Sequence, residues 1–291
     1  MGHTYERTIQ VNLERFVASW GPVSWRDQIA GARPAPNAYL ARLFHALSRI
    51  EDEAFLMQIK IRAVGASCYS AIREFNAIWL AEESEHSRAL AALSDRYGGV
   101  GDWRPGPSVN ISRRRLALAL PRLFLIRTLP RESVLATYLS LGALQEYVAL
   151  TTYNAAAELV GDDEPARLLL AAISRQEGRH MRFYRSGAEA ILHESSISRT
   201  IVRIAAAHFW QPPGLDLLGF HTWCDTFLPL LEMPDVMEKF KRLDAVAGNL
   251  LGLEGIAIMT RFLEQSAVRE KLPNHREGVL DLLVKDERID Y

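Results

Sequence analysis

The sequence predicts an all-α protein, and three observations support this fold class. Apolar residues recur at three- and four-residue steps over long stretches, the spacing that gives a helix one apolar face. Residues that commonly begin and end helices bound these stretches. Alternating runs rich in valine and threonine and bounded by hairpin turns are missing from the sequence, so we expect no sheet.

Four long helices are predicted first. They cover about residues 37–65, 69–97, 132–160 and 162–193. The first has Leu43 and Leu47 four residues apart on one face, and the second and third end at Gly98 and Gly161. The fourth begins with acidic residues followed by Pro165, and both features are favoured in a first helical turn.

Shorter helices are predicted after the long ones. They cover about residues 197–209, 221–231, 236–268 and 275–285. Loops rich in glycine and proline are expected at 98–110 and 211–214. No low-complexity linker divides the chain, so we expect residues 1–291 to form one domain. Its core would be a bundle at about 37–193, with extra C-terminal helices at 197–285.

Composition limits the classes of function. The formal net charge of -1 gives no overall attraction to nucleic acid or to a membrane. The two cysteines, Cys68 and Cys224, provide neither a disulfide framework nor a cysteine-based metal site. No long uncharged apolar stretch and no apolar targeting segment near Met1 are present. We therefore expect a cytoplasmic protein with no membrane span and no nucleic-acid partner.

Two Glu-x-x-His sequences occur in the predicted long helices, Glu83 to His86 and Glu177 to His180. Residues three apart share one face of a helix, so each pair can direct a carboxylate and an imidazole to one place. A single copy would be weak support for a site, because a chain with 35 acidic residues and eight histidines can produce one by chance.

A glutamate on a further predicted helix precedes each pair, and this strengthens the interpretation. Glu51 lies 32 residues before Glu83, and Glu146 lies 31 residues before Glu177. One glutamate from each of two helices and Glu-x-x-His from each of two others form the two-metal site of ferritin-like bundles. We therefore predict a ferritin-like four-helix bundle core with additional helices. The predicted metal ligands and catalytic residues are Glu51, Glu83, His86, Glu146, Glu177 and His180.

Four carboxylates and two imidazoles are ligands that iron and manganese both accept, so two irons are predicted and manganese is an alternative. Glu53 is the alternative to Glu51, because three adjacent carboxylates occur there. Glu82 and Glu85 flank the first motif and are expected either to orient a histidine or to be exposed. The alternative to a metal site is a set of solvated glutamates and of histidines with hydrogen-bond partners in the core.

The residues around these motifs resemble the soluble acyl-carrier-protein desaturases of plants and actinobacteria. The stretch from Trp79 to His86 is similar to the family's Trp-Thr-Ala-Glu-Glu-Asn-Arg-His. The stretch 175–185 resembles the second motif of actinobacterial members, and Gln145-Glu146 and the segment 209–220 are also similar to the family. The resemblance covers roughly residues 40–220.

This resemblance implies an oxygen-dependent di-iron desaturase that introduces a double bond into a fatty acyl chain on acyl carrier protein. Dioxygen would be the co-substrate, a ferredoxin-type protein the electron donor, and the enzyme a homodimer. Trp79, one turn before Glu83, would either help electrons to enter or pack in the core.

Two residues depart from the family's pattern. Gln176 stands where members usually have an acidic residue, and Ala149 stands where they usually have threonine. These departures leave open a di-iron oxygenase that hydroxylates another carrier-bound or free small molecule. A non-catalytic iron-binding bundle is a further alternative.

A basic segment is the expected docking site for protein partners. Residues 103–131 contain seven arginines and no acidic residue, and Arg113, Arg114 and Arg115 are consecutive. Acyl carrier protein and ferredoxin are acidic, so these arginines could attract either of them. A solvated basic helix is the alternative, and contact with a membrane surface is a weaker one.

Overall fold

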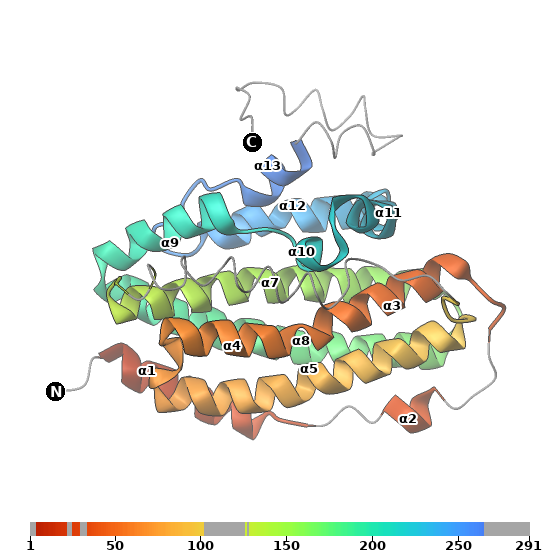
Figure 1. The fold of residues 1–291 in the computed structure, drawn as a ribbon, viewed down its shortest axis with the longest axis horizontal. Coiled ribbons are helices and arrows are strands. Elements are labelled where there is room, and N and C mark those ends of the chain that lie inside the picture. The colour runs from red at the N-terminus through yellow and green to blue at the C-terminus, as the bar shows by residue number, and fades with distance from the viewer. Residues whose placement is uncertain (1–3, 22–24, 30–33, 102–125, 127, 265–291) are drawn as a thin grey trace.

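The computed structural model describes residues 4–21, 25–29, 34–101, 126 and 128–264. Within these residues all regular structure is helical and no strand occurs, so the predicted all-α class is confirmed (Figure 1). None of the helices in this part of the chain is long and apolar enough to cross a membrane.

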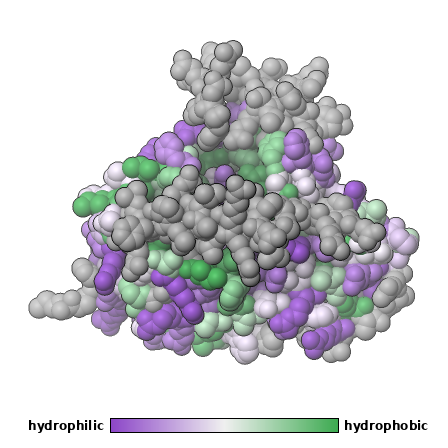
Figure 2. Space-filling model, viewed as in Figure 1, coloured by the Kyte–Doolittle hydropathy of each residue, from purple (hydrophilic) through white to green (hydrophobic). Residues whose placement is uncertain are grey.

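Four long helices form the bundle that was predicted. They are α3 (Ala38–Asp52), α5 (Ser70–Arg96), α7 (Arg131–Leu159) and α8 (Glu164–Glu194). Helix α3 packs against α5, and α7 packs against α8 along most of its length (Figure 1). In the space-filling view, hydrophilic and hydrophobic residues are interspersed over the visible face (Figure 2). The fully buried leucine and aromatic side chains lie between the helices.

The first predicted helix is interrupted, so the expectation of one continuous helix over 37–65 is wrong. Asn37 caps α3 as expected, because its side-chain oxygen accepts hydrogen bonds from the backbone N–H groups of Tyr39 and Leu40 at 3.0 Å. At Glu53 the backbone N–H bonds to Ile50, three residues back, which tightens the last turn and ends the helix. Helix α4 (Ala54–Val64) and the short 3₁₀ helix η1 (Ala66–Cys68) follow.

An amphipathic helix at the N-terminal end was not predicted. Helix α1 (Thr4–Ala18) buries Tyr5, Ile9, Leu13 and Phe16 against α8 and α5. These four residues recur at three- and four-residue steps, so the helical pattern is present in the sequence. A short helix, α2 (Trp25–Gln28), lies beside α8.

A layer of shorter helices covers α7 and part of α3 on the upper side of Figure 1. It consists of α9 (Ser196–Phe209), α10 (Leu215–Leu218), α11 (Phe220–Leu231), α12 (Pro234–Gly248) and α13 (Ile258–Glu264). The predicted helix over 236–268 is wrong, because turns at 249–257 separate α12 from α13. Gly252 and Gly255 have φ angles of 89° and 70° there, a conformation that interrupts a right-handed helix. The helix predicted at 275–285 lies outside the described residues.

Candidate metal centre

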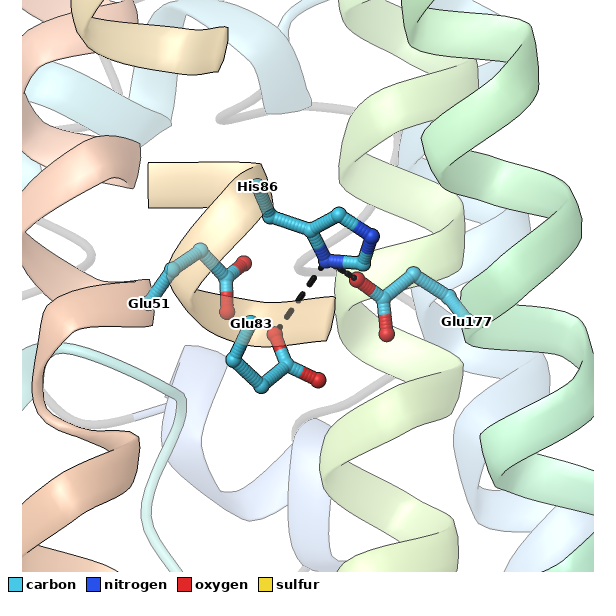
Figure 3. A group of neighbouring side chains, drawn as sticks. All are labelled: Glu51, Glu83, His86 and Glu177. Carbon is cyan, nitrogen blue, oxygen red and sulfur yellow. Dashed lines mark hydrogen bonds and ion pairs between the residues drawn. The ribbon is translucent and has the colours of Figure 1, made fainter. Parts of the chain in front are cut away.

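The structure brings all six predicted ligands together inside the bundle. Each long helix contributes at least one: Glu51 comes from α3, Glu83 and His86 from α5, Glu146 from α7, and Glu177 and His180 from α8. Figure 3 shows that four of these side chains converge from three helices. The repeated spacing in the sequence therefore corresponds to one cluster in space.

The cluster contains two overlapping groups of potential ligands. Glu51, Glu83, His86 and Glu177 form the first, which we call the cavity-side subsite, and Glu83, Glu146, Glu177 and His180 form the second, the inner subsite. In each group, one ligand atom from every residue lies within 4.8 Å of the others. Glu83 and Glu177 belong to both groups. Each group could hold a metal ion, and the two shared carboxylates could contact both ions.

The burial of these carboxylates would destabilise the fold if no positive charge accompanied them. His86 and His180 are 0% exposed, Glu177 1% and Glu83 2%, while Glu51 is only partly buried. Ionised carboxylates that are removed from water and left unpaired destabilise a fold by several kcal/mol each, about the cost of burying an unpaired charge in a protein. Cations or protons must therefore accompany these groups.

The hydrogen bond behind His86 determines which of its nitrogens faces the cluster. Gln176 donates its amide N–H to the carbonyl oxygen of Gly21 at 2.7 Å, so its own oxygen must point the other way. That oxygen lies 2.6 Å from His86 Nε2, which therefore carries a hydrogen. His86 Nδ1 is left facing Glu177 Oε1 at 3.0 Å and Glu83 Oε2 at 3.2 Å.

His180 is oriented in the same way by a carboxylate. Its Nε2 lies 2.7 Å from Glu82 Oε2, and the other oxygen of Glu82 accepts a hydrogen bond from Arg179. His180 Nδ1 then faces Glu83 Oε1 and Glu177 Oε2, both at 3.2 Å. The expectation that Glu82 orients a histidine is thus met, and Glu82 of α5 supports a histidine of α8 while Gln176 of α8 supports His86 of α5.

The unsatisfied atoms of the cluster fit metal ions. Among the described residues, Glu83 Oε1 and Glu177 Oε1 are buried without a hydrogen-bond partner. Each lies close to a histidine Nδ1. This nitrogen has no hydrogen and presents a lone pair when Nε2 carries the hydrogen. Two lone pairs facing each other need a cation between them, so the donor set suits metal binding by Nδ1 and carboxylate oxygen.

Protons are the alternative to metal. Burial lowers the pKa of His86, but the carboxylates of Glu177 and Glu83 outweigh this and place that pKa well above its ordinary value. Burial, together with neighbouring carboxylates, raises the pKa of Glu51 and of Glu146 well above the ordinary range. Metal ions would displace these protons, so metal uptake releases protons and weakens in acid.

Two aromatic residues hold the carboxylates that are not shared between the groups. The indole N–H of Trp79 donates to Glu146 Oε1 at 3.1 Å, and the hydroxyl of Tyr153 donates to Glu51 Oε1. The sequence analysis placed Trp79 on the ligand face but missed Tyr153. Tyr153 lies seven residues, about two helical turns, after Glu146 on α7, so its position on the ligand face was available from the spacing.

The other residues considered at this site take different positions. Glu53 lies between α3 and α4 and belongs to neither ligand group. Glu85 points away and bonds to Arg88 at 2.8 Å and to Trp25 at 3.0 Å. The basic segment with Arg113, Arg114 and Arg115 lies outside the described residues.

An apolar cavity lies between the bundle and the C-terminal layer. The cavity is narrow, with a volume of about 30 Å³, and its wall is almost entirely apolar. Glu51 and Tyr153 belong to this wall, so the cavity reaches the metal centre on the side of Glu51. The other lining residues are Leu47, Ile50, Val148, Ala149, Thr152, Pro213, Trp223, Phe227, Leu231, Phe240 and Met259.

Comparison of the chain with models of protein families, with curated proteins and with solved structures gives no match. The functional interpretation therefore rests on the residues of the site and on their geometry.

Proposed function

We propose that the protein is an oxygen-dependent di-iron oxidoreductase that introduces a double bond into a fatty acyl chain carried on acyl carrier protein. One observation carries this proposal: a buried cluster of four carboxylates and two imidazoles adjoins an apolar cavity at Glu51. A metal centre alone would not need such a cavity, and an apolar cavity alone would not need the charged cluster.

The ligand roles follow from membership in the two groups. Glu83 and Glu177 would contact both metals, Glu51 and Glu146 one each, and each metal would have one histidine. Iron suits this set of oxygen and nitrogen ligands, and manganese is the alternative. When bound, the two irons would supply the activation of dioxygen that is needed to remove hydrogens from unactivated C–H bonds, which side chains cannot do.

The lining of the cavity favours an apolar substrate. Its wall consists of aliphatic and aromatic side chains such as Val148, Trp223 and Phe227, which exclude water and can pack against methylene groups. Burying each methylene contributes roughly 0.8 kcal/mol, so a chain of several carbons would be held without polar contacts. A thioester on a carrier protein would present such a chain, and a ferredoxin-type protein would supply electrons.

A second candidate is a di-iron oxygenase that hydroxylates a carrier-bound or free small molecule. Ala149 favours it, because this position in the cavity wall lies one turn from Glu146 and carries no hydroxyl. Gln176 also gives His86 a neutral partner instead of a charged one. The mass of the product separates the two reactions, since desaturation removes two hydrogens and hydroxylation adds one oxygen.

Metal content and the optical spectrum of protein from iron-replete cells test the metal centre. We expect about two irons per chain, the number for which this ligand pattern is built. Glu83→Ala should lose both, because Glu83 belongs to both groups. Glu85→Ala is the matched control on the same helix and should keep them.

The loaded protein is then given acyl carrier protein charged with a fatty acid, a reduced ferredoxin and oxygen. A product lighter by two hydrogens supports the desaturase, and one heavier by an oxygen supports the oxygenase. Iron uptake without oxidation of any carrier-bound chain would favour a non-catalytic iron-binding bundle. If the wild-type protein and the Glu85→Ala control both bind no transition metal, the proposal is wrong.

A further inference from the structure

We infer that the two metal subsites are unequal, and that the inner subsite around His180 binds its metal more tightly than the cavity-side subsite around His86. The inference rests on the proposed function only in requiring that the cluster bind two metals. It concerns the order in which they bind and which of them exchanges.

The ligands themselves do not create the difference. Each subsite has three carboxylates and one imidazole, and two of the carboxylates, Glu83 and Glu177, are common to both. Each unshared carboxylate also accepts one hydrogen bond from an aromatic residue. Any inequality must come from the groups behind the histidines and from access to the unshared carboxylates.

The group behind His180 strengthens it as a ligand. Its Nε2–H donates to the carboxylate of Glu82 at 2.7 Å, and Arg179 holds the other oxygen of Glu82 in place. A carboxylate that accepts this hydrogen draws the proton toward itself and makes the metal-binding nitrogen more basic. Arg179 in turn donates a hydrogen bond to the carbonyl oxygen of Ser19 at 2.6 Å, which helps to hold its side chain in place.

The group behind His86 is neutral. Its Nε2–H donates to the amide oxygen of Gln176, which is held in that orientation by the bond to Gly21. A neutral amide draws the proton less than a carboxylate does, so His86 Nδ1 is the weaker donor. The difference between the two histidines therefore arises from one residue at equivalent positions, Glu82 before Glu83 and Gln176 before Glu177.

The accessibility of the unshared carboxylates also favours tighter binding at the inner subsite. Glu146 is 7% exposed, whereas Glu51 is only partly buried and lies in the wall of the apolar cavity. Glu51 is the one ligand of the cluster among the residues that line this cavity. A metal at the cavity-side subsite is thus nearest to entering molecules and is the one expected to leave first.

Anaerobic titration of the metal-free full chain with Fe²⁺, followed by calorimetry, tests the inequality. We expect two binding steps that differ by roughly 10-fold or more, the usual effect of a partner behind a metal-bound histidine. Two equal steps in the wild-type protein would overturn the inference. No binding at all would instead refute the metal centre itself, so the two failures are distinguishable.

A matched pair of variants assigns the steps to the subsites. Glu51 belongs only to the cavity-side subsite and Glu146 only to the inner one, and a glutamine at either place keeps an acceptor for Tyr153 or Trp79. Glu51→Gln should weaken only the weak step, and Glu146→Gln only the tight step. The opposite assignment would contradict the inference, and circular dichroism checks that both variants keep their helices.

The cause is tested by restoring a carboxylate behind His86. Gln176→Glu should tighten the weak step by roughly 10-fold or more, the range over which such partners change metal affinity. Gln176→Leu leaves the His86 N–H without an acceptor and should weaken the same step further. If both variants bind two metals and neither changes the metal affinity of the weak step, the group behind His86 does not determine that affinity and the inference fails.

Discussion

At the scale of single residues, Tyr153 is the clearest addition to the site. Its side chain is fully buried, its hydroxyl donates to Glu51, and its ring forms part of the cavity wall. The hydrogen bond from Tyr153 therefore holds one oxygen of Glu51 in place. The hydroxyl thus sets the orientation of a ligand at the point where the metal centre and the cavity meet.

Tyr153→Phe should weaken metal binding at the cavity-side subsite while the fold is retained. The ring still fills its place, and the loss of one hydrogen bond costs the fold only about 1 kcal/mol. Loss of a residue that orients a ligand commonly lowers metal affinity by roughly 10- to 100-fold. Titration with Fe²⁺ would show this as a weaker second step.

Tyr184→Phe is the control for this prediction. Tyr184 is also a buried tyrosine, and its hydroxyl bonds to Tyr138 at 2.9 Å and not to a ligand. Its loss should leave both binding steps unchanged. Equal weakening in the two variants would show that Tyr153 affects the site only through general packing.

The clustering of the six candidate ligands could be predicted from the sequence, because helical spacing places each Glu-x-x-His pair on one face and the four-helix pattern adds Glu51 and Glu146. Their partners could not be identified in the same way. Glu82 reaches His180 and Gln176 reaches His86 across the contact between α5 and α8. Such pairings depend on how two helices are turned relative to one another, which the spacing within either helix does not specify.

At the scale of elements, a buried ion pair joins the end of α5 to the start of α8. Two of the three guanidinium nitrogens of Arg96, Nε and Nη2, donate hydrogen bonds to Asp163 at 2.8 Å. The hydroxyl of Tyr97 donates to the same carboxylate at 2.8 Å. The side chains of Arg96 and Asp163 are 4% and 5% exposed. Two of the ligand helices are therefore held together at their ends by charge.

Asp163→Ala should lower the free energy of unfolding by about 3 kcal/mol, because it leaves the buried Arg96 without its carboxylate. Urea unfolding of the metal-free protein at neutral pH measures this. Asp162→Ala is the matched control, since Asp162 is exposed and its loss should change stability by less than about 0.5 kcal/mol.

The stabilisation by Asp163 should also depend on pH in one direction. Burial raises the pKa of this carboxyl, but the hydrogen bonds from Arg96 and Tyr97 outweigh burial and place it below the ordinary value. A lowered pKa in the folded state means that the stabilisation is complete above the unfolded value of about 3.9 and declines as pH falls through the folded value. The difference in free energy of unfolding between wild type and Asp163→Ala should therefore decrease only below about pH 4. A decrease already between pH 7 and pH 5 would contradict this.

Element boundaries were predicted less well than the elements themselves. The breaks at Glu53 and at residues 249–257 interrupt stretches whose apolar spacing continues on both sides. Glu53 itself keeps a right-handed helical conformation, so nothing in its residue type announces the end of α3. In contrast, the apolar pattern of α1 is visible in the sequence, because Tyr5, Ile9, Leu13 and Phe16 recur at helical spacing.

At the scale of the whole molecule, the C-terminal layer forms one wall of the cavity beside the candidate metal centre. Helices α11, α12 and α13 contribute Trp223, Phe227, Phe240 and Met259 to the cavity, and the bundle contributes the opposite wall. The role of this part of the chain could not be predicted from spacing, because the cavity forms only where the layer and the bundle meet. Its apolar wall is what turns a metal site into a candidate site for oxidising a carbon chain.

Ala149→Leu tests whether the substrate occupies this cavity. Ala149 is in the wall one turn after Glu146, and leucine there would add a bulky apolar group to a narrow cavity of about 30 Å³. The two irons should remain, because no ligand is changed, while kcat/KM for a long acyl chain should fall by at least about 10-fold, a loss of roughly 1.4 kcal/mol in transition-state stabilisation. Ala149→Ser, which is close to alanine in size, should keep the long chain as substrate. An acyl chain that is converted equally well by all three proteins, each with full iron, would have to reach the metals by a route other than this cavity.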